Sequence, residues 1–225
     1  MSYRFRIVQT FILRAFCLGG LLLAAHSPAW AGPSKDLDFA MELFDEGEFA
    51  AAMNIFGLAI SDGGLTTKQL AIAHHFRGVA RSKLEKHSLS LRDHKKAVEW
   101  NPNYVDGWSA ICFENATHFK ALDEAMAACN RALSLDPKHG LSYARRAGVW
   151  TQMGEVAKAE ADYTQAVQLD PDSWEIHYDW GRFLHLQNRA AEAKKALFRA
   201  YKLAPTWMHS YLATLPIIQE YRVSK

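Results

Sequence analysis

The sequence predicts an all-α protein, a solenoid of about five similar helical hairpins followed by a C-terminal capping helix. Pro137, Pro171 and Pro205 lie 34 residues apart, the spacing of repeats that each contain two helices and a turn. Small residues also recur at matching places in every unit, once on the first helix and twice on the second. One hairpin cannot bury its apolar face alone, so the units are expected to stack.

The recurring small residues mark where the two helices of a hairpin approach each other closely. On the first helix this position holds Ala40, Gly78, Cys112, Ala147 and Gly181. On the second helix one position is alanine in every unit, at Ala59, Ala97, Ala132, Ala166 and Ala200. Such side chains permit interaxial distances near the short end of the usual range of about 8–10 Å. Larger residues fill the spaces, among them Phe56, His94, Cys129, Tyr163 and Leu197.

Turn and stop signals set the order of the units. The repeat array is expected over residues 32–207, with units at about 33–66, 71–104, 105–139, 140–173 and 174–207. Gly47 and Gly154 mark turns between helices, because glycine enters the left-handed region without a Cβ penalty. The first unit has Gly64 in place of the later proline and a longer connection after it. The third unit fits only with one residue inserted in its turn near His118.

The C-terminal segment, residues 208–225, is expected to contain a capping helix over His209–Tyr221. Its apolar residues would cover the last hairpin, as the end of a stack of repeats requires. Pro216 is expected to kink this helix or divide it in two. The alternative is that the segment docks a second copy of the chain.

On these residues, the segment from 33 to about 207 resembles five tetratricopeptide repeats. The fourth unit matches best, with the family's residue types at Tyr143, Ala147, Trp150, Gly154, Ala159, Tyr163, Ala166 and Pro171. The resemblance implies a right-handed superhelix whose first helices line a concave groove that binds a peptide or a partner protein.

Carried over position by position, the resemblance gives an apolar N-terminal half of the groove, a middle of small residues and a polar C-terminal half. The residues are Leu37, Met41, Phe44, His75, Val79, Ser82, Ser109, Phe113, Ala144, Gly148, Thr151, Glu175, Tyr178, Arg182 and His185. Such a surface suits an extended peptide or a helix with apolar anchors at one end. Alternatively, Leu37, Met41 and Phe44 pack on the next hairpin or under the N-terminal segment.

One class of partner is not expected. Family members that bind the C-terminal carboxylate of cytosolic chaperones resemble one another in a set of lysine, asparagine and arginine residues. The equivalent positions here are His75, Val79, Ala110, Leu141 and Arg145, of which only Arg145 fits.

No enzyme motif occurs in the chain: neither a G-x-S-x-G elbow, an H-E-x-x-H pair, a phosphate-binding glycine loop nor a C-x-x-C motif is present. The sequence therefore predicts no catalytic residue, no cofactor and no small-molecule substrate. His74, His75 and His94 all belong to the second hairpin. Because His94 falls in a core position and His75 in a groove position, no metal site is predicted.

The N-terminus has the pattern of a secretory signal peptide. Three arginines precede an apolar stretch, and the triplet Ala29-Trp30-Ala31 predicts cleavage after Ala31, hence export, with the periplasm as the expected location. The alternative is an uncleaved membrane anchor that starts near Ile7. Cleavage would leave 23 basic residues against 24 acidic ones, which argues against nucleic acid as a partner because such binding needs an excess of basic charge.

Two cysteines remain after cleavage, Cys112 and Cys129, one on each helix of the third hairpin. Their positions face each other at nearly the same height, so an exported chain could join them in a disulfide. The alternative is two small buried thiols.

Together these patterns predict a non-enzymatic scaffold or adaptor that binds a protein or peptide in its groove. A second hypothesis is an assembly or tethering factor that acts through its ends or as a membrane-anchored subunit. A third is an accessory metal or redox protein that uses the histidines and cysteines.

Overall fold

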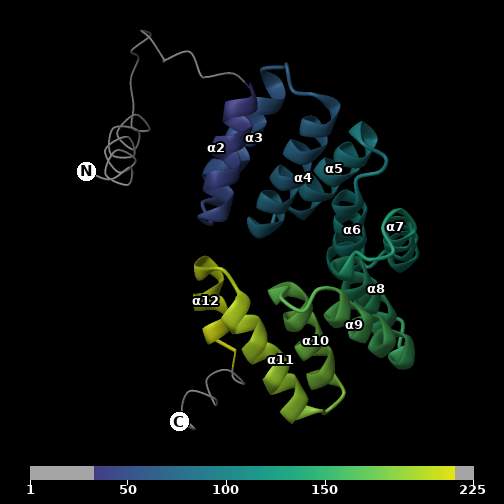
Figure 1. Ribbon diagram of the computed structural model, residues 1–225. Helices are drawn as coiled ribbons and strands as arrows, with labels where there is room; N and C mark the ends of the chain where they lie inside the picture. The colour runs from purple at the N-terminus through teal and green to yellow at the C-terminus, as the bar shows by residue number, and fades with distance from the viewer. Residues whose placement is uncertain (1–32, 216–225) are drawn as a thin grey trace. The chain divides into compact units, whose positions relative to one another are not determined.

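The computed structural model describes residues 33–215, and over this range it contains helices and no strand. The predicted signal segment, together with Pro216 and the chain beyond it, lies outside the described residues. Ten helices pair into five hairpins, and a short helix follows the last one (Figure 1). The bounds are α2 Pro33–Asp45, α3 Phe49–Ser61, α4 Thr67–Lys83, α5 His87–Trp100, α6 Val105–Glu114, α7 Leu122–Leu135, α8 Gly140–Gln152, α9 Val156–Leu169, α10 Trp174–Leu186, α11 Ala190–Leu203 and α12 Thr206–Ala213.

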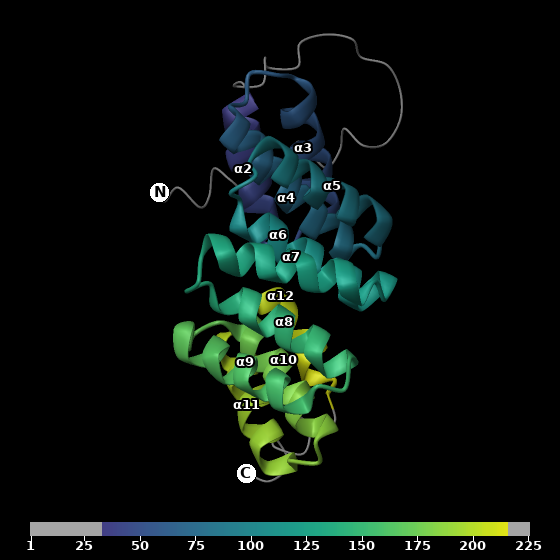
Figure 2. The same cartoon turned by 90° about the vertical axis from the view of Figure 1, so that its right-hand side faces the viewer.

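Each hairpin packs against the next, and each first helix also contacts the first helix of the following hairpin. The array is therefore an α-solenoid with the first helices toward one side (Figure 1). The second helices take the other side, where α7 crosses the face turned toward the viewer in Figure 2.

The predicted small positions are buried where two helices meet. Ala59, Ala97, Ala132, Ala166 and Ala200 are all fully buried. A Cβ atom at Gly78 would lie 2.7 Å from the ring of His94, and one at Gly181 would lie 2.6 Å from Leu197. The first helix thus provides a gap that a large side chain of the second helix fills, which explains the alternation of small and large residues.

The turn of each hairpin contains a residue in the left-handed region. Glycine takes this place at Gly47 and Gly154, as predicted. The other three hairpins use Glu85, Lys120 and Asn188, with φ between 56 and 60°. Since every hairpin ends its first helix in the same way, the five turns hold the helix pairs in similar geometry.

The inserted residue of the third unit appears as a π-helical turn, Asn115–Phe119, which extends α6 before the chain reverses at Lys120. A π-turn accommodates one extra residue without breaking the helix. The prediction of an insertion near His118 is thus met by a widened turn.

Two boundaries differ from those predicted. Helix α4 begins at Thr67, before the expected start of the unit at residue 71, because Thr66 and Gln69 form a reciprocal capping box. Helix α12 begins at Thr206 and ends at Ala213, so it is shorter than the predicted capping helix. It does pack on the last hairpin: Leu212 is fully buried, and the ring of His209 stacks on Tyr201 at 4.9 Å.

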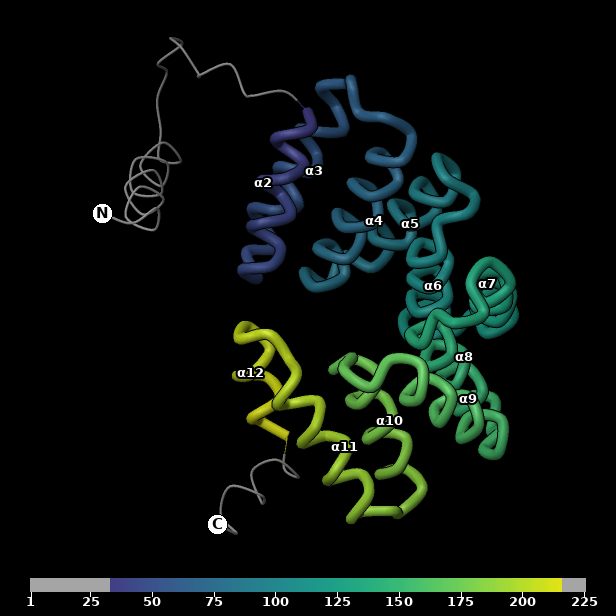
Figure 3. The backbone as a smooth tube through the Cα atoms, viewed as in Figure 1, coloured from purple at the N-terminus to yellow at the C-terminus, as the bar shows by residue number. Residues whose placement is uncertain are grey.

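Helix α12 also contacts the first hairpin. The ring of Trp207 meets the ring of Phe49 edge to face, with centroids 5.0 Å apart. Figure 3 shows the turn between α2 and α3 beside the start of α12. A Cβ atom at Gly47 would lie 2.8 Å from Trp207, so glycine is required at this turn for contact as well as for conformation. We call the contact of Trp207 with Gly47 and Phe49 the terminal contact.

No helix within residues 33–215 has both the length and the apolar character needed to cross a bilayer.

Candidate functional site

Side chains from several hairpins come together along the side formed by the first helices. The guanidinium of Arg145 on α8 lies 4.0 Å from the ring centre of Phe113 on α6. At the end of α4, Lys83 Nζ lies 5.7 Å from the ring centre of Trp174 and 5.1 Å from that of Trp207. We call this surface the inner face and define it by Lys83, Phe113, Arg145, Trp174, Glu175, Tyr178, Asp179 and Arg182.

The charges of the inner face influence one another. Burial raises the pKa of the Asp179 carboxyl, although the positive charges of Arg145 and Arg182 oppose this shift. Removal from water lowers the pKa of Lys83, and the charge of Arg145 lowers it further. These mutual effects indicate that the cations and the anion lie close enough together to influence one another's protonation.

Arg145 lies at the centre of this surface and has an unused donor. Its Nε atom is buried and makes no hydrogen bond to any described residue. Its guanidinium lies over the aromatic face of Phe113, which holds the planar fork in place. A fixed guanidinium with a free N–H is suited to bind a carboxylate.

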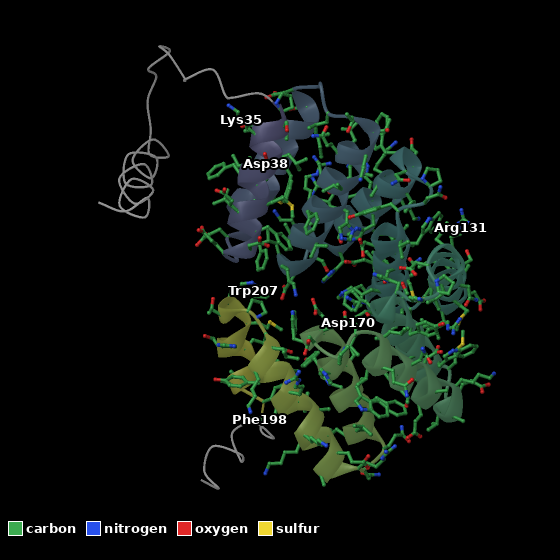
Figure 4. The ribbon with its side chains drawn as sticks, viewed as in Figure 1. Lys35, Asp38, Arg131, Asp170, Phe198 and Trp207 are labelled. Atoms are coloured by element: carbon green, nitrogen blue, oxygen red, sulfur yellow. A yellow bond between two sulfur atoms is a disulfide. The ribbon has the colours of Figure 1, made fainter. Side chains whose placement is uncertain are left out.

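Aromatic rings border the charged groups. Tyr178 and Tyr211 join their hydroxyl groups at 3.0 Å, and the guanidinium of Arg182 lies 5.6 Å from the ring centre of Tyr178. Trp174 meets Trp207 edge to face at 6.2 Å. Figure 4 shows Trp207 at the end of α12 that faces α2. The inner face therefore offers both apolar rings and charged groups to a ligand.

An open hollow of about 510 Å³ adjoins this surface at the starts of α8 and α10. Its lining includes Trp174 and Glu175 of the inner face, together with Asp136, His139 and Asp170. His139 is held by Asp106, with Nε2 at 3.1 Å from the carboxylate. The hollow extends the inner face toward the connections between hairpins.

The structure places most of the predicted groove residues at least partly on the surface. Arg182 and His185 are exposed, and the residues of intermediate burial are Met41, Phe44, His75, Val79, Phe113, Gly148, Thr151 and Tyr178. Ser82 and Glu175 are also of intermediate burial.

Three predicted groove residues are buried and do not form a surface. Leu37 is 6% exposed, Ser109 2% and Ala144 1%. Leu37 belongs to the apolar cluster between α2 and α3, and Ala144 belongs to the cluster of the fourth and fifth hairpins. Contact between neighbouring hairpins covers these positions, so the prediction was wrong for them.

The apolar N-terminal half of the predicted groove packs mainly on its own hairpins. The ring of Phe44 meets Phe49 at 5.3 Å and Phe76 at 5.2 Å, both edge to face. Met41 packs against the same buried cluster. These contacts agree with the alternative interpretation, in which the residues support the fold. His75 lies against Phe76, His94 and Tyr104, and burial lowers its pKa to about 4.

Sequence reasoning missed several residues of the inner face. Lys83, Trp174 and Asp179 were not predicted, and Arg145 was considered only for a carboxylate clamp. A signal was present, since Arg145 and Asp179 lie 34 residues apart, one position beyond a predicted groove column in consecutive hairpins. Charge at matching first-helix positions would have identified both.

Comparison with known proteins agrees with this architecture. Family models of the tetratricopeptide repeat match residues 119–139 and 151–213. A thermophilic protein of this family from Thermus thermophilus has a similar solved fold, with a TM-score of 0.69 and 21% identity over 86% of this chain and 98% of that one. A MamA structure from Desulfovibrio magneticus RS-1 has a TM-score of 0.53 and 13% identity, over 76% of this chain and 94% of the other.

A curated relative is the Hsp70-Hsp90 organizing protein 3 of Arabidopsis thaliana, 25% identical over 155 residues. The match covers 64% of this chain but only 27% of the relative's length. Repeat period, helix pairing, family models and solved folds all agree that the described residues form an array of tetratricopeptide repeats.

Proposed function

We propose that this chain is a non-enzymatic scaffold that binds an extended segment of a partner protein on its inner face. Proteins with tetratricopeptide repeats act as scaffolds for protein–protein interaction. The single observation that supports this site is the free Nε of Arg145, which is buried, fixed over Phe113 and surrounded by groups from three other helices. A partner segment with a carboxylate for Arg145 and an apolar side chain for Trp174 or Phe113 fits this chemistry.

A chaperone tail is not the partner that we propose. The curated relative is a chaperone organizer by name, but the positions of the carboxylate clamp contain only Arg145 here. One arginine binds one acidic group, whereas a clamp requires several cations and amides around a terminal carboxylate. We therefore favour an acidic side chain within an extended segment.

The first experiment identifies the partner by site-specific photocrosslinking in cells. A photoreactive phenylalanine analogue replaces Phe113 on the inner face, and a matched variant carries it at Val156, an exposed residue of the outer helix α9. Adducts at position 113 that are absent at position 156 support the proposal. The same adducts at both positions, or none at 113, contradict it.

The second experiment tests the charge. Arg145→Glu is expected to weaken capture of the crosslinked partner by about tenfold or more, because charge-assisted hydrogen bonds contribute about 1.5–3 kcal/mol. Arg131→Glu is the control, since Arg131 is an exposed residue of the outer helix α7 and undergoes the same change of charge (Figure 4). Circular dichroism verifies that both variants remain helical. Equal loss of partner capture in Arg145→Glu and Arg131→Glu would contradict a binding site at Arg145.

We also propose that the working protein is periplasmic. The signal pattern before Ala31 supports this location, as does a disulfide between Cys112 and Cys129, since such bonds persist in oxidising compartments. N-terminal sequencing of the protein from the periplasmic fraction should begin at Gly32. A chain that starts at Met1 would favour the membrane-anchored alternative.

A further inference from the structure

Three metal-binding side chains meet where the second and third hairpins pack. They are His87 at the start of α5, Glu114 at the end of α6 and His118 in the π-turn that follows. One potential ligand atom from each residue lies within 4.8 Å of the other two. Within residues 33–215, no other group of three histidine, cysteine, aspartate or glutamate side chains brings its potential ligand atoms this close together.

Glu114 has an unsatisfied, buried oxygen. The residue is 1% exposed, and its Oε1 accepts a hydrogen bond from Ser90 Oγ at 2.7 Å. Its Oε2 accepts no hydrogen bond from any described residue. A carboxylate oxygen that is removed from water without a partner is costly, so a cation beside it would stabilise the local structure.

His87 has the complementary defect. Its Nδ1 is also buried without a hydrogen bond, and it lies 3.7 Å from Glu114 Oε2, too far for one to form. His87 Nδ1 and Glu114 Oε2 therefore lie near each other, and neither has a hydrogen-bond partner among the described residues. The simplest alternative to a bound cation is an ion pair between protonated His87 and the carboxylate of Glu114.

The π-turn brings in the third side chain. The ring of His118 stacks on the ring of His87, with centroids 3.4 Å apart and planes inclined by 11°. His118 itself is exposed, so the site opens to solvent on this side. Widened helical turns of this kind occur frequently at functional sites. The inserted residue of the third unit thus brings His118 close to His87 and Glu114.

We propose that His87, Glu114 and His118 bind one divalent transition-metal ion, with zinc as the expected ion. Two imidazoles and one carboxylate form a donor set that zinc accepts, with ligand distances of about 2.0–2.2 Å. The lone pair of an imidazole nitrogen lies in the ring plane, so binding must turn the two stacked rings apart. Three protein ligands leave one position of a tetrahedral ion for water or another ligand.

The bound ion would join two hairpins beside the inner face. Its ligands come from the second and third hairpins, and His118 lies against the ring of Phe113 at 5.7 Å. Metal binding would therefore fix the position of α6 relative to α5 next to a residue of the inner face. This inference stands on the cluster itself and does not depend on the proposed partner.

The test is zinc binding by the purified chain without a histidine tag, measured by isothermal titration calorimetry. One zinc per chain is expected. His118→Ala should weaken binding by more than about tenfold and should leave the fold intact, because His118 is exposed. Glu114→Gln should weaken it as well. His185→Ala, at an exposed histidine of α10, is the matched control and should bind as the wild type does.

Cobalt substitution provides a second measurement. Co²⁺ in a site with few ligands gives visible absorption bands that the hydrated ion lacks, and these bands should vanish in His118→Ala. X-ray absorption of the zinc complex should show imidazole scattering. No zinc binding by the wild type, or equal binding by wild type and His118→Ala, would overturn the proposal and leave the ion pair of His87 and Glu114 as the occupant.

Discussion

At the scale of single residues, Asp93 shows how a charge is kept inside a hairpin. Arg77 donates to both oxygens of this carboxylate, at 2.7 and 3.0 Å, and Arg81 donates at 2.6 Å. Arg146 and Asp162 form the same bidentate pair in the fourth hairpin. Both pairs use the same two positions of the repeat, which hold apolar residues in the other three hairpins. The arginine and the aspartate therefore occur together or not at all.

Asp93→Asn should destabilise the protein by about 3–5 kcal/mol, because it leaves the partly buried guanidinium groups of Arg77 and Arg81 without their anion. Urea unfolding followed by circular dichroism measures the change. Asp162→Asn is the matched control, with a smaller expected loss because Asp162 is 8% exposed and Asp93 is 2% exposed. Equal stability of Asp93→Asn and the wild type would contradict this account.

The same residue should contribute to acid sensitivity. Burial alone would raise the pKa of Asp93, but hydrogen bonds from His74 and Arg77 and the charges of Arg77 and Arg81 lower it overall below 3.8. A carboxyl whose pKa is lower in the folded state adds stability above its unfolded pKa and loses it as the pH falls through the folded value. The difference in unfolding free energy between the wild type and Asp93→Asn should therefore shrink below about pH 4.

At the scale of helices, the two facing positions of a hairpin are filled in different ways. Gly78 leaves room for His94, Gly181 leaves room for Leu197, and in the third hairpin Cys112 and Cys129 join in a disulfide with a Cα–Cα distance of 5.3 Å. The disulfide takes the place of a large side chain in a small gap. It also joins α6 to α7 next to the π-turn, where the helix is least regular.

Reduction of this disulfide should destabilise the protein by about 3 kcal/mol, the loop-closure entropy expected for cysteines separated by 17 positions in the sequence. The measurement is urea unfolding with and without a thiol reductant. A variant with Cys112→Ala and Cys129→Ala serves as the control, since reductant should not change its midpoint. An unchanged midpoint for the wild type would show that the cysteines are not joined.

Repetition explains which elements could be predicted from the sequence. The helix pairs, the buried small residues, the turns at Gly47 and Gly154 and the insertion near His118 all leave marks at a fixed period. The turns at Glu85, Lys120 and Asn188 leave none, because the hairpin geometry forces non-glycine residues into the left-handed region. The burial of Leu37 and Ala144 depends on how closely successive hairpins pack, and no single repeat determines that distance.

At the scale of the whole array, the terminal contact departs from the usual behaviour of repeat proteins. Each repeat of a solenoid ordinarily contacts only its neighbours. Here Trp207 of α12 packs on Gly47 and Phe49 of the first hairpin, and Lys83 Nζ lies near Trp207 as well. Such a contact depends on the summed rotation of five hairpins, so it could not be predicted from the repeat pattern.

Trp207→Ala should separate the two ends of the array. The substitution removes two edge-to-face ring pairs, with Phe49 and with Trp174, and each is expected to cost about 0.5–1.5 kcal/mol beyond the area that the ring buries. Small-angle X-ray scattering should give a larger radius of gyration, and amide exchange should rise around Phe49. Trp100→Ala, at an exposed tryptophan of α5, should change neither quantity. An unaltered radius in Trp207→Ala would show that the terminal contact does not hold the ends together.

The terminal contact joins the first and last parts of the array, so the hairpins form a closed ring of contacts. In an open solenoid, a hairpin that a ligand displaces can move toward the nearer free end of the array without affecting distant hairpins. Because the two ends touch here, separation of α8 from α10 is expected to strain the contact of Trp207 with Phe49 as well. Ligand binding at the inner face is then expected to change the surroundings of Trp207 and with them its fluorescence emission.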